Sequence, residues 1–239
     1  MRRILISGGS RGIGRACVRA FAQNGDAVAF LYCHNDEAAR EATAETGAYA
    51  IRADVSDPEA VRAAVAEAEK KLGGTIDVLV NNAAVAWIGL MQDMTDAEWR
   101  RVLDTNLSGA FYLSRAVVGS MIRNHYGRIL HVGSMWGKTG ASCEVAYSAA
   151  KAGLRGLTMS MAKELGPSGI TVNCIEPGLI DTDMNASLDA DTKASLCAET
   201  PLGRIGTPDE VAEAILFLTS NRAAFITGQI LGVDGGMAI

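Results

Sequence analysis

Short apolar segments alternate along this chain with longer segments in which apolar residues recur every three or four positions. The short segments have only four to six residues and are rich in valine, isoleucine and aromatic side chains, so they predict strands. The longer segments between them predict about six helices. The seven predicted strands cover residues 4–7, 27–32, 49–53, 76–80, 128–132, 171–175 and 229–233.

Three helix starts have the spacing of a capping box, in which a serine or threonine caps the helix and a glutamate three residues later bonds back to it. Pro208 stands at the first helical position of the third, where a proline is well tolerated. The pairs are Ser56 with Glu59, Thr95 with Glu98, and Thr207 with Glu210.

The alternation of strands and helices predicts a doubly wound α/β fold. Consecutive parallel strands need right-handed crossovers, which place helices on both faces of a mostly parallel sheet. The chain has 239 residues, 49% of them hydrophobic, which suits one Rossmann-like domain over residues 1–239. We expect a cofactor half at about 1–125 and a catalytic half at about 126–239. The polar, alanine-rich segment 185–199 is either a lid or an ordinary surface helix.

Composition narrows the class of partner. The net charge is −5 and the basic residues are scattered, so we expect no nucleic-acid partner and no membrane partner. No apolar stretch is long enough to span a bilayer. The five cysteines are widely spaced and form no metal-ligand pattern, which favours reduced thiols, no metal site and a cytoplasmic protein. Small-molecule chemistry is therefore the leading expectation.

A glycine-rich turn directly follows the first predicted strand. Glycines at 8, 12 and 14 permit a tight turn and close approach of the backbone to a diphosphate, which the following helix N-terminus would attract. The predicted phosphate-binding residues of this turn are Gly8, Ser10, Arg11, Gly12, Ile13 and Gly14.

Four polar residues further along suit the reduction of a carbonyl group. Tyr147 and Lys151 are spaced i, i+4 and so share one helix face, where the lysine charge would lower the pKa of the phenol. Ser134 ends the fifth strand, where its hydroxyl can bond a substrate oxygen. Asn106, in the helix that starts near Thr95, would hold a water that links Lys151 to solvent.

These motifs together resemble the short-chain dehydrogenase/reductase family from Leu5 to Gly236. The bacterial 3-oxoacyl-[acyl-carrier-protein] reductases are the most similar group, because their tail is echoed by residues 201–208, 225–229 and 233–236. The resemblance implies an NADPH-dependent carbonyl reductase of fatty-acid biosynthesis, a homotetramer, and acyl carrier protein as a partner. It also assigns cofactor contacts to Asp54, Val55, Asn82, Ala83, Tyr147, Lys151, Pro177, Gly178, Ile180 and Thr182.

The end of the second strand favours NADP(H) over NAD(H). No acidic residue stands there before Asp36, whereas an acid that binds the adenosine ribose marks NAD-binding folds. Arg11 resembles the family's arginine for the 2′-phosphate, with His34 and Asn35 as helpers. A solvated loop cation is the alternative for Arg11.

The substrate is less determined. The positions at which acyl reductases carry basic residues for the carrier are here Asn124, His125 and Ser168. Trp136 and Glu144, with Ser134 and Tyr147, would form the substrate mouth, and a carboxylate there suits a cationic substrate.

The run around these mouth residues is similar to the elongation factor P 5-aminopentanone reductases, which reduce a ketone on a modified lysine. Glu144 is alternatively a helix-entry acid favoured by the helix dipole. Two further alternatives are an alcohol dehydrogenase working in the opposite direction and a nucleotide-sensing protein without turnover. The presence of both Tyr147 and Lys151 argues against the last.

Overall fold

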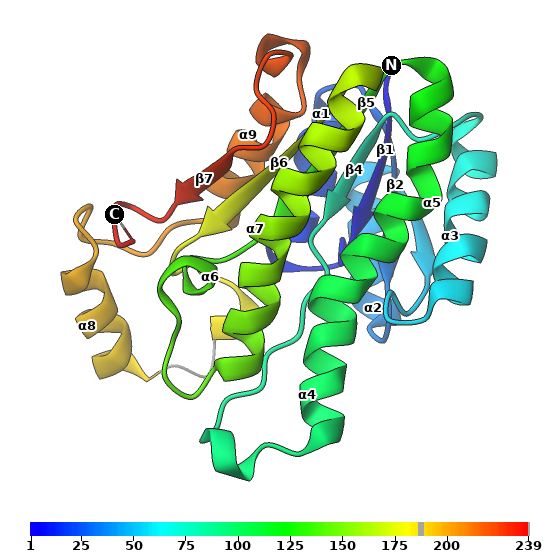
Figure 1. Cartoon of the computed structure of the whole chain (residues 1–239). Coiled ribbons are helices and arrows are strands. Elements are labelled where there is room, and N and C mark those ends of the chain that lie inside the picture. Colours follow the sequence, from blue (N-terminus) through cyan, green and yellow to red (C-terminus); the bar gives the residue numbers. More distant parts are fainter. Residues whose placement is uncertain (186–188, 239) are drawn as a thin grey trace.

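The computed structural model of the protein describes residues 1–185 and 189–238. Seven parallel strands form one sheet in the order β3-β2-β1-β4-β5-β6-β7 (Figure 1). This confirms the predicted doubly wound α/β fold. The strands are β1 (Arg3–Ser7), β2 (Ala27–Tyr32), β3 (Tyr49–Arg52), β4 (Val78–Asn81), β5 (Gly127–Val132), β6 (Ile170–Pro177) and β7 (Ile230–Val233).

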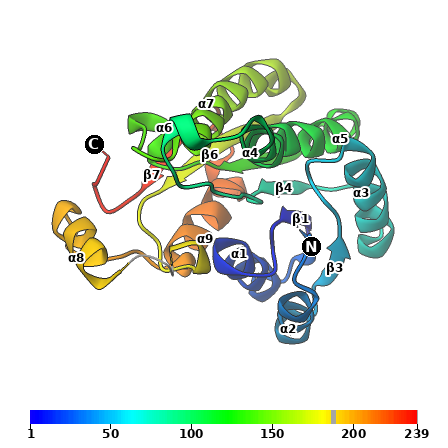
Figure 2. The same ribbon diagram turned by 90° about the horizontal axis from the view of Figure 1, so that it is seen from below.

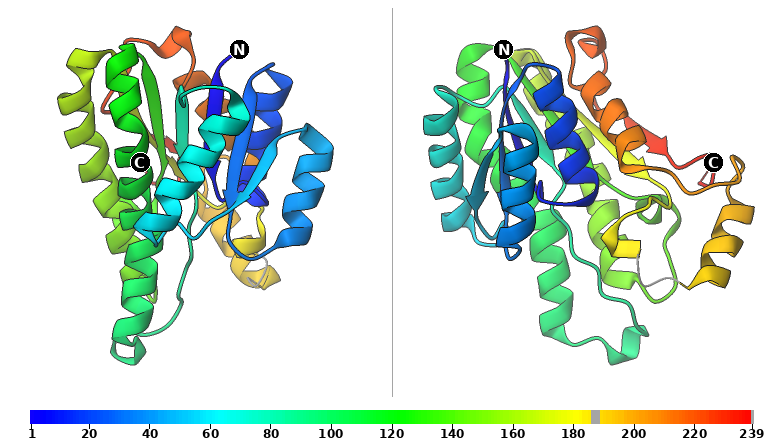
Figure 3. Two further views of the ribbon diagram at one scale, coloured as in Figure 1. Left: turned by 90° about the vertical axis from the view of Figure 1, so that its right-hand side faces the viewer. Right: turned by 180° about the vertical axis from the view of Figure 1, so that it is seen from behind.

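Helices cover both faces of the sheet (Figures 2 and 3). One face carries α1 (Gly12–Gln23), α2 (Asp36–Thr46) and α9 (Pro208–Leu218). The other carries α3 (Pro58–Leu72), α4 (Asp96–Leu103), α5 (Gly109–Asn124) and α7 (Val145–Leu165). Helices α6 (Trp136–Thr139) and α8 (Ala190–Glu199) lie beyond the sheet edge. The described part of the chain thus has more helices than expected. The reasons are that α4 and α5 are separate elements, that α6 is a single turn, and that α8 lies in the segment for which a lid was the alternative.

The core follows from the two-residue period of the strands. Ile4 and Ile6 pack in the cluster beneath α1, α2 and α9, whereas Leu5 packs with Leu79 and Ile129 beneath α3 and α5. All of these side chains are almost fully buried. Central strands that are covered on both faces have near-continuous apolar sequences, and this is why the short segments were recognisable.

Two of the three predicted capping boxes are present. Thr95 with Glu98 caps α4, and Thr207 with Glu210 caps α9. The prediction of a capping box at Ser56 is wrong, because Asp57 caps α3 by accepting a hydrogen bond from Glu59 N at 2.8 Å. Ser56 instead donates to Asp54. Asp57 precedes Pro58, which fits the first helical position, so α3 begins one residue later than predicted.

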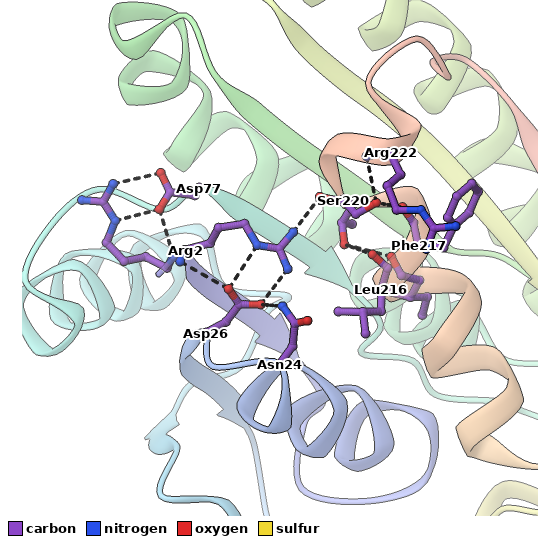
Figure 4. A network of polar contacts seen from close by, with 11 residues as sticks. Arg2, Asn24, Asp26, Asp77, Leu216, Phe217, Ser220 and Arg222 are labelled. Atoms are coloured by element: carbon purple, nitrogen blue, oxygen red, sulfur yellow. Dashed lines mark hydrogen bonds and ion pairs between the residues drawn. The ribbon is translucent and has the colours of Figure 1, made fainter.

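Ion pairs fasten the ends of the strands that lie far from the cavity described below (Figure 4). The Arg2 guanidinium contacts the Asp26 carboxylate at 2.6 Å and donates to Thr219 O at 2.8 Å, which joins β1 to β2 and α9. Burial alone would raise the pKa of Asp26, but hydrogen bonds from Arg2 and Asn24 outweigh it and hold that pKa below its usual value. Arg3 Nε likewise donates to Asp77 Oδ2 at 2.8 Å, and this ion pair joins β1 to the start of β4.

The C-terminal ends of the strands meet at the lower edge of the sheet in Figure 1, where α4 and the segment before it extend beyond the strands and α6 and α8 flank them. Open α/β sheets bind ligands at this edge. No helix within residues 1–185 and 189–238 is long and apolar enough to cross a bilayer.

Candidate active site

One cavity of about 1240 Å³ runs along the C-terminal ends of the strands. It is lined by every candidate site residue predicted from the sequence except Gly14 and Asn106. Residues from the first glycine turn to the loop after β6 therefore come together in one place, and the volume is large enough for a dinucleotide together with a substrate.

The glycine turn has the geometry of a diphosphate cradle. Gly8 and Gly12 have positive φ angles of 68° and 54°, which glycine alone adopts readily. A Cβ on Gly14 would lie 2.0 Å from Gly8 O, so this glycine serves the packing of α1 against the turn. Asn82 holds the turn by donating to Ser7 O and Gly8 O at 3.0 and 3.1 Å. The N-terminus of α1 thus faces a backbone-lined hollow that fits a dinucleotide diphosphate.

The adenosine end suits a 2′-phosphate. The Arg11 side chain is 65% exposed, lines the cavity, and has Asp183 as its nearest acid at 3.9 Å. Asn35 uses its side-chain oxygen to cap α2, leaving its amide nitrogen for a ligand, and His34 lines the same wall. Asp36 does not line the cavity and lies 3.9 Å from Arg52 instead. The residues present therefore fit NADP(H) better than NAD(H).

Buried groups surround Tyr147 and Lys151 on α7. Lys151 is 2% exposed and donates to Val132 O at 2.7 Å, with Nζ 5.4 Å from the Tyr147 ring centroid. Burial lowers the pKa of Lys151 to about 8. Burial, and next the Glu144 charge, raise the pKa of Tyr147 to about 12, although the Ser134 hydroxyl lowers it. The lowering by Lys151 expected from the sequence is not among the causes of this pKa shift, and the Tyr147 phenol is neutral at pH 7.

Ser134 lies just beyond β5, with Gly133 between it and Val132. Its Oγ accepts a hydrogen bond from Trp136 N at 3.2 Å, which turns the hydroxyl toward the cavity wall shared with Tyr147. A small residue is required beside it, since a Cβ on Gly133 would lie 2.9 Å from Cys174 Sγ. The end of β5 thus brings Ser134 and the Val132 carbonyl to the tyrosine and the lysine.

Asn106 lies in the helix that starts at Thr95, as predicted. It lies in a π-helical segment, Asp104–Ser108, that joins α4 to α5. Its Oδ1 accepts from Val85 N at 2.8 Å and its Nδ2 donates to Val85 O at 2.9 Å. The side-chain oxygen and nitrogen of Asn106 thus both bind the loop after β4, and the water expected at Asn106 stays a prediction.

Trp136 and Glu144 both line the cavity near Tyr147. Glu144 stands at the N-cap of α7 but makes no capping hydrogen bond, and burial raises the pKa of its carboxyl group. Within the described ranges this carboxylate has no ion-pair partner. The predicted lid segment 185–199 contributes Asn185 and Leu196 to the lining, while its residues 186–188 lie outside the described residues.

Sequence reasoning missed a buried polar cluster behind the site. His131 on β5 is fully buried, with Nδ1 3.1 Å from Asn81 Nδ2, and that amide also donates to Ser114 Oγ at 3.1 Å. Burial and the Lys151 charge lower the pKa of His131 to about 4, so the imidazole is neutral. A polar pair in adjacent strands at the same register level was the available signal.

Comparisons with known proteins agree with this geometry. Residues 8–238 match the family described as "Enoyl-(Acyl carrier protein) reductase". Two relatives are named 3-oxoacyl-[acyl-carrier-protein] reductase FabG: that of Chlamydia muridarum is 43% identical and that of Escherichia coli K12 is 40% identical, each alignment covering 98% of this chain and 96% of the relative.

Two solved structures are also similar. A putative gluconate dehydrogenase from Agrobacterium tumefaciens has a TM-score of 0.94 at 34% identity, covering 99% of this chain and 96% of that one. A 3-oxoacyl-[acyl-carrier protein] reductase from Brucella melitensis has a TM-score of 0.92 at 35% identity, covering 100% and 91%.

The predicted oxidoreductase class, acting on CH–OH and C=O groups, and the predicted NADP(H) cofactor are confirmed at the level of the family. The chain belongs to the short-chain dehydrogenase/reductase family.

Proposed function

We propose that this protein is an NADPH-dependent 3-oxoacyl thioester reductase, with acyl carrier protein as the partner that presents the substrate. The observation that carries the proposal is the convergence of Ser134, Tyr147 and Lys151 on the cavity that also holds the glycine turn. The names of the relatives at 40–43% identity support the thioester substrate.

Each catalytic residue has a distinct role in this proposal. Bound NADPH supplies a hydride to the carbonyl carbon. Ser134 Oγ donates a hydrogen bond to the carbonyl oxygen, where negative charge develops. Tyr147 transfers its phenolic proton to that oxygen, so the ketone gains one hydride and one proton and becomes an alcohol.

Lys151 stabilises the phenolate that this transfer leaves on Tyr147. Its ammonium group is fixed by Val132 O at 2.7 Å, and a buried positive charge acts strongly because little water screens it. The other N–H groups of Lys151 are available to the cofactor ribose and to the return of the proton. Asn106 acts one step away, because its two hydrogen bonds hold Val85 and hence the loop that lines the cavity.

The same proposal extends to the assembly and the compartment. We propose one domain over residues 1–239 and a homotetramer, supported by apolar side chains that are about two-fifths exposed on α5, α7 and β7, namely Phe111, Met159 and Leu231. A cytoplasmic location is supported by the five cysteines, all of which are free thiols.

The test follows NADPH absorbance with acetoacetyl thioester on carrier protein and on coenzyme A, with NADH as the parallel cofactor. We expect rapid oxidation of NADPH and slow oxidation of NADH with both thioesters. Binding of NADPH without turnover of either thioester would overturn the proposal.

Glu144 favours a second candidate, the reduction of a ketone that bears an amine. A half-buried carboxylate without an internal cation lines the cavity beside the proton donor, and an ammonium group would pair with it. Elongation factor P carrying a 5-aminopentanone-modified lysine is the corresponding protein substrate. For this candidate, an aminoketone should be reduced with a lower KM than its uncharged analogue, and Glu144→Gln should remove that difference. Equal KM values would contradict it.

A further inference from the structure

Two adjacent arginines line the catalytic cavity from α4. Arg100 and Arg101 are both exposed, and they share one face of the helix with Ala97 and Asp104, which line the same cavity. The spacing i, i+3, i+4, i+7 accounts for this common face. The cavity therefore has three separate cationic positions: Arg11 at the adenosine end, Lys151 beneath Tyr147, and this pair.

Neither arginine has a carboxylate within ion-pair distance among residues 1–185 and 189–238. Of the acids nearby in sequence, Glu98 belongs to the capping box with Thr95 and Asp104 accepts from Ser108 Oγ at 3.4 Å. Asp96, in the first turn of α4, makes no ion pair with either arginine. Some other exposed arginines, such as Arg62 and Arg204, are paired, whereas Arg40 and Arg123 are not paired within the described part of the chain. Arg100 and Arg101 are therefore distinguished by their place in the cavity wall and not by the lack of an ion pair alone.

The helix dipole does not explain the pair. Cations are favoured in the last turn of a helix because its final carbonyl groups are free. Here α4 continues through the π-helical segment into α5 without a break, so the carbonyl groups after Arg101 remain inside a hydrogen-bonded helix. The two charges therefore face the cavity without an ion pair to the described residues and without a free helix end beside them.

The position of the pair relates it to the reaction site. Asn106, which holds Val85 in the cavity wall, follows Arg101 by five residues, or about one and a half helical turns. The arginines thus lie in the last turn of α4, further from α5 than Asn106.

We infer that Arg100 and Arg101 bind the phosphate of a phosphopantetheine arm whose thioester carries the ketone. This inference rests on the proposed thioester reductase function. A guanidinium group offers paired N–H donors that match the oxygens of a phosphate, and two neighbouring arginines suit one phosphodiester. Acyl carrier protein and coenzyme A both contain this phosphate. The inference therefore concerns the phosphopantetheine arm, and the experiment below distinguishes between the two carriers.

The experiment compares three acetoacetyl thioesters in the full-length enzyme: on carrier protein, on coenzyme A, and on N-acetylcysteamine, which has the same thioester but no phosphate. The variants are Arg100→Gln, Arg101→Gln and the double variant. The matched control is Arg62→Gln, which removes an exposed arginine on α3 that does not line the cavity.

We expect KM for the two phosphate-bearing thioesters to rise about fivefold in each single variant and about twentyfold in the double variant, with kcat unchanged, because an exposed charged contact contributes modestly. KM for the N-acetylcysteamine thioester and the Kd for NADPH, measured by fluorescence, should stay the same. Raised salt should shrink the difference between parent and variants, because the contact is exposed.

Four outcomes would overturn the inference alone. The first two are an equal rise in KM for all three thioesters and weaker binding of NADPH. The third is a rise in KM for the coenzyme A thioester alone, which would assign the arginines to the nucleotide phosphates of coenzyme A. The fourth is a rise in KM for the carrier-protein thioester alone, which would assign the arginines to the surface of the carrier protein. If the parent enzyme reduces none of the three thioesters, the proposed function fails first and the inference fails with it.

Discussion

Replacing Lys151 by methionine should stabilise the protein while it abolishes the reaction. Burial lowers the pKa of this ammonium group from its ordinary 10.5 to about 8, which corresponds to a cost of about 3 kcal/mol for keeping the charge in the folded state at neutral pH. Methionine has a similar length and no charge. The variant also loses the hydrogen bond from Lys151 to Val132 O, which costs about 1 kcal/mol. We therefore expect the unfolding free energy to increase by about 2 kcal/mol in total.

The gain has a defined pH dependence. Below pH 8 the lysine is protonated in both the folded and the unfolded state, so the full cost is present in the parent. Between pH 8 and 10.5 the unfolded state binds more protons, so the stability of the parent rises with pH and the advantage of the variant shrinks. Above about pH 10.5 this contribution to the difference disappears.

Thermal unfolding at fixed protein concentration measures both effects. At pH 7, Lys151→Met should raise Tm by about 4–8 °C, since 1 kcal/mol is about 2–4 °C for a chain of this length. Lys163→Met is the matched control, because Lys163 is exposed on the same helix and should change Tm little. A lower Tm for Lys151→Met at pH 7, or a gain that is the same at pH 7 and pH 10, would refute the reasoning.

Three further predictions concern the cofactor and the chemistry. Tyr147→Phe should lower kcat by roughly two to four orders of magnitude and leave the Kd for NADPH unchanged; near-normal turnover would exclude Tyr147 as the proton donor. Gly14→Ala should weaken NADPH binding at least about tenfold, measured by fluorescence titration, because its Cβ would lie 2.0 Å from Gly8 O and 2.6 Å from Asn82 Nδ2. Arg11→Gln should raise KM for NADPH about tenfold and leave KM for NADH almost unchanged, and an equal rise in both would place the arginine on a phosphate common to the two cofactors.

The sequence was informative where one interaction dominates locally. Buried strands are recognisable as continuous apolar runs. The threonines at 95 and 207 cap their helices because each has a glutamate three residues later that accepts a hydrogen bond from the threonine backbone. At the start of α3, Ser56 and Asp57 are adjacent and either can cap. The proline after Asp57 decides between them, and this competition is not visible in the spacing of Ser56 and Glu59.

The site was less predictable where an effect depends on three-dimensional surroundings. The spacing of Tyr147 and Lys151 predicted their shared face, but the sign of the shift in the tyrosine pKa depends on burial, which spacing does not report. Asn106 was identified from the family pattern, yet its partner is the backbone of Val85, on a loop that is distant in sequence. A π-helical turn leaves the apolar period of the neighbouring helices intact, so no sequence period predicted it.

That π-helical turn makes the length of the segment between α4 and α5 a determinant of the active site. A π bulge corresponds to one residue inserted into a regular α-helix, and each residue turns the helix by about 100°. Deleting a single residue from Asp104–Ser108 would restore regular hydrogen bonding and rotate the whole of α4 by that angle against α5. The cavity would then be lined by a different stripe of α4 side chains, although every remaining residue of the site would be unchanged. Homologous proteins that differ by one residue at this position should therefore differ in the substrates that they accept, even where their catalytic residues are identical.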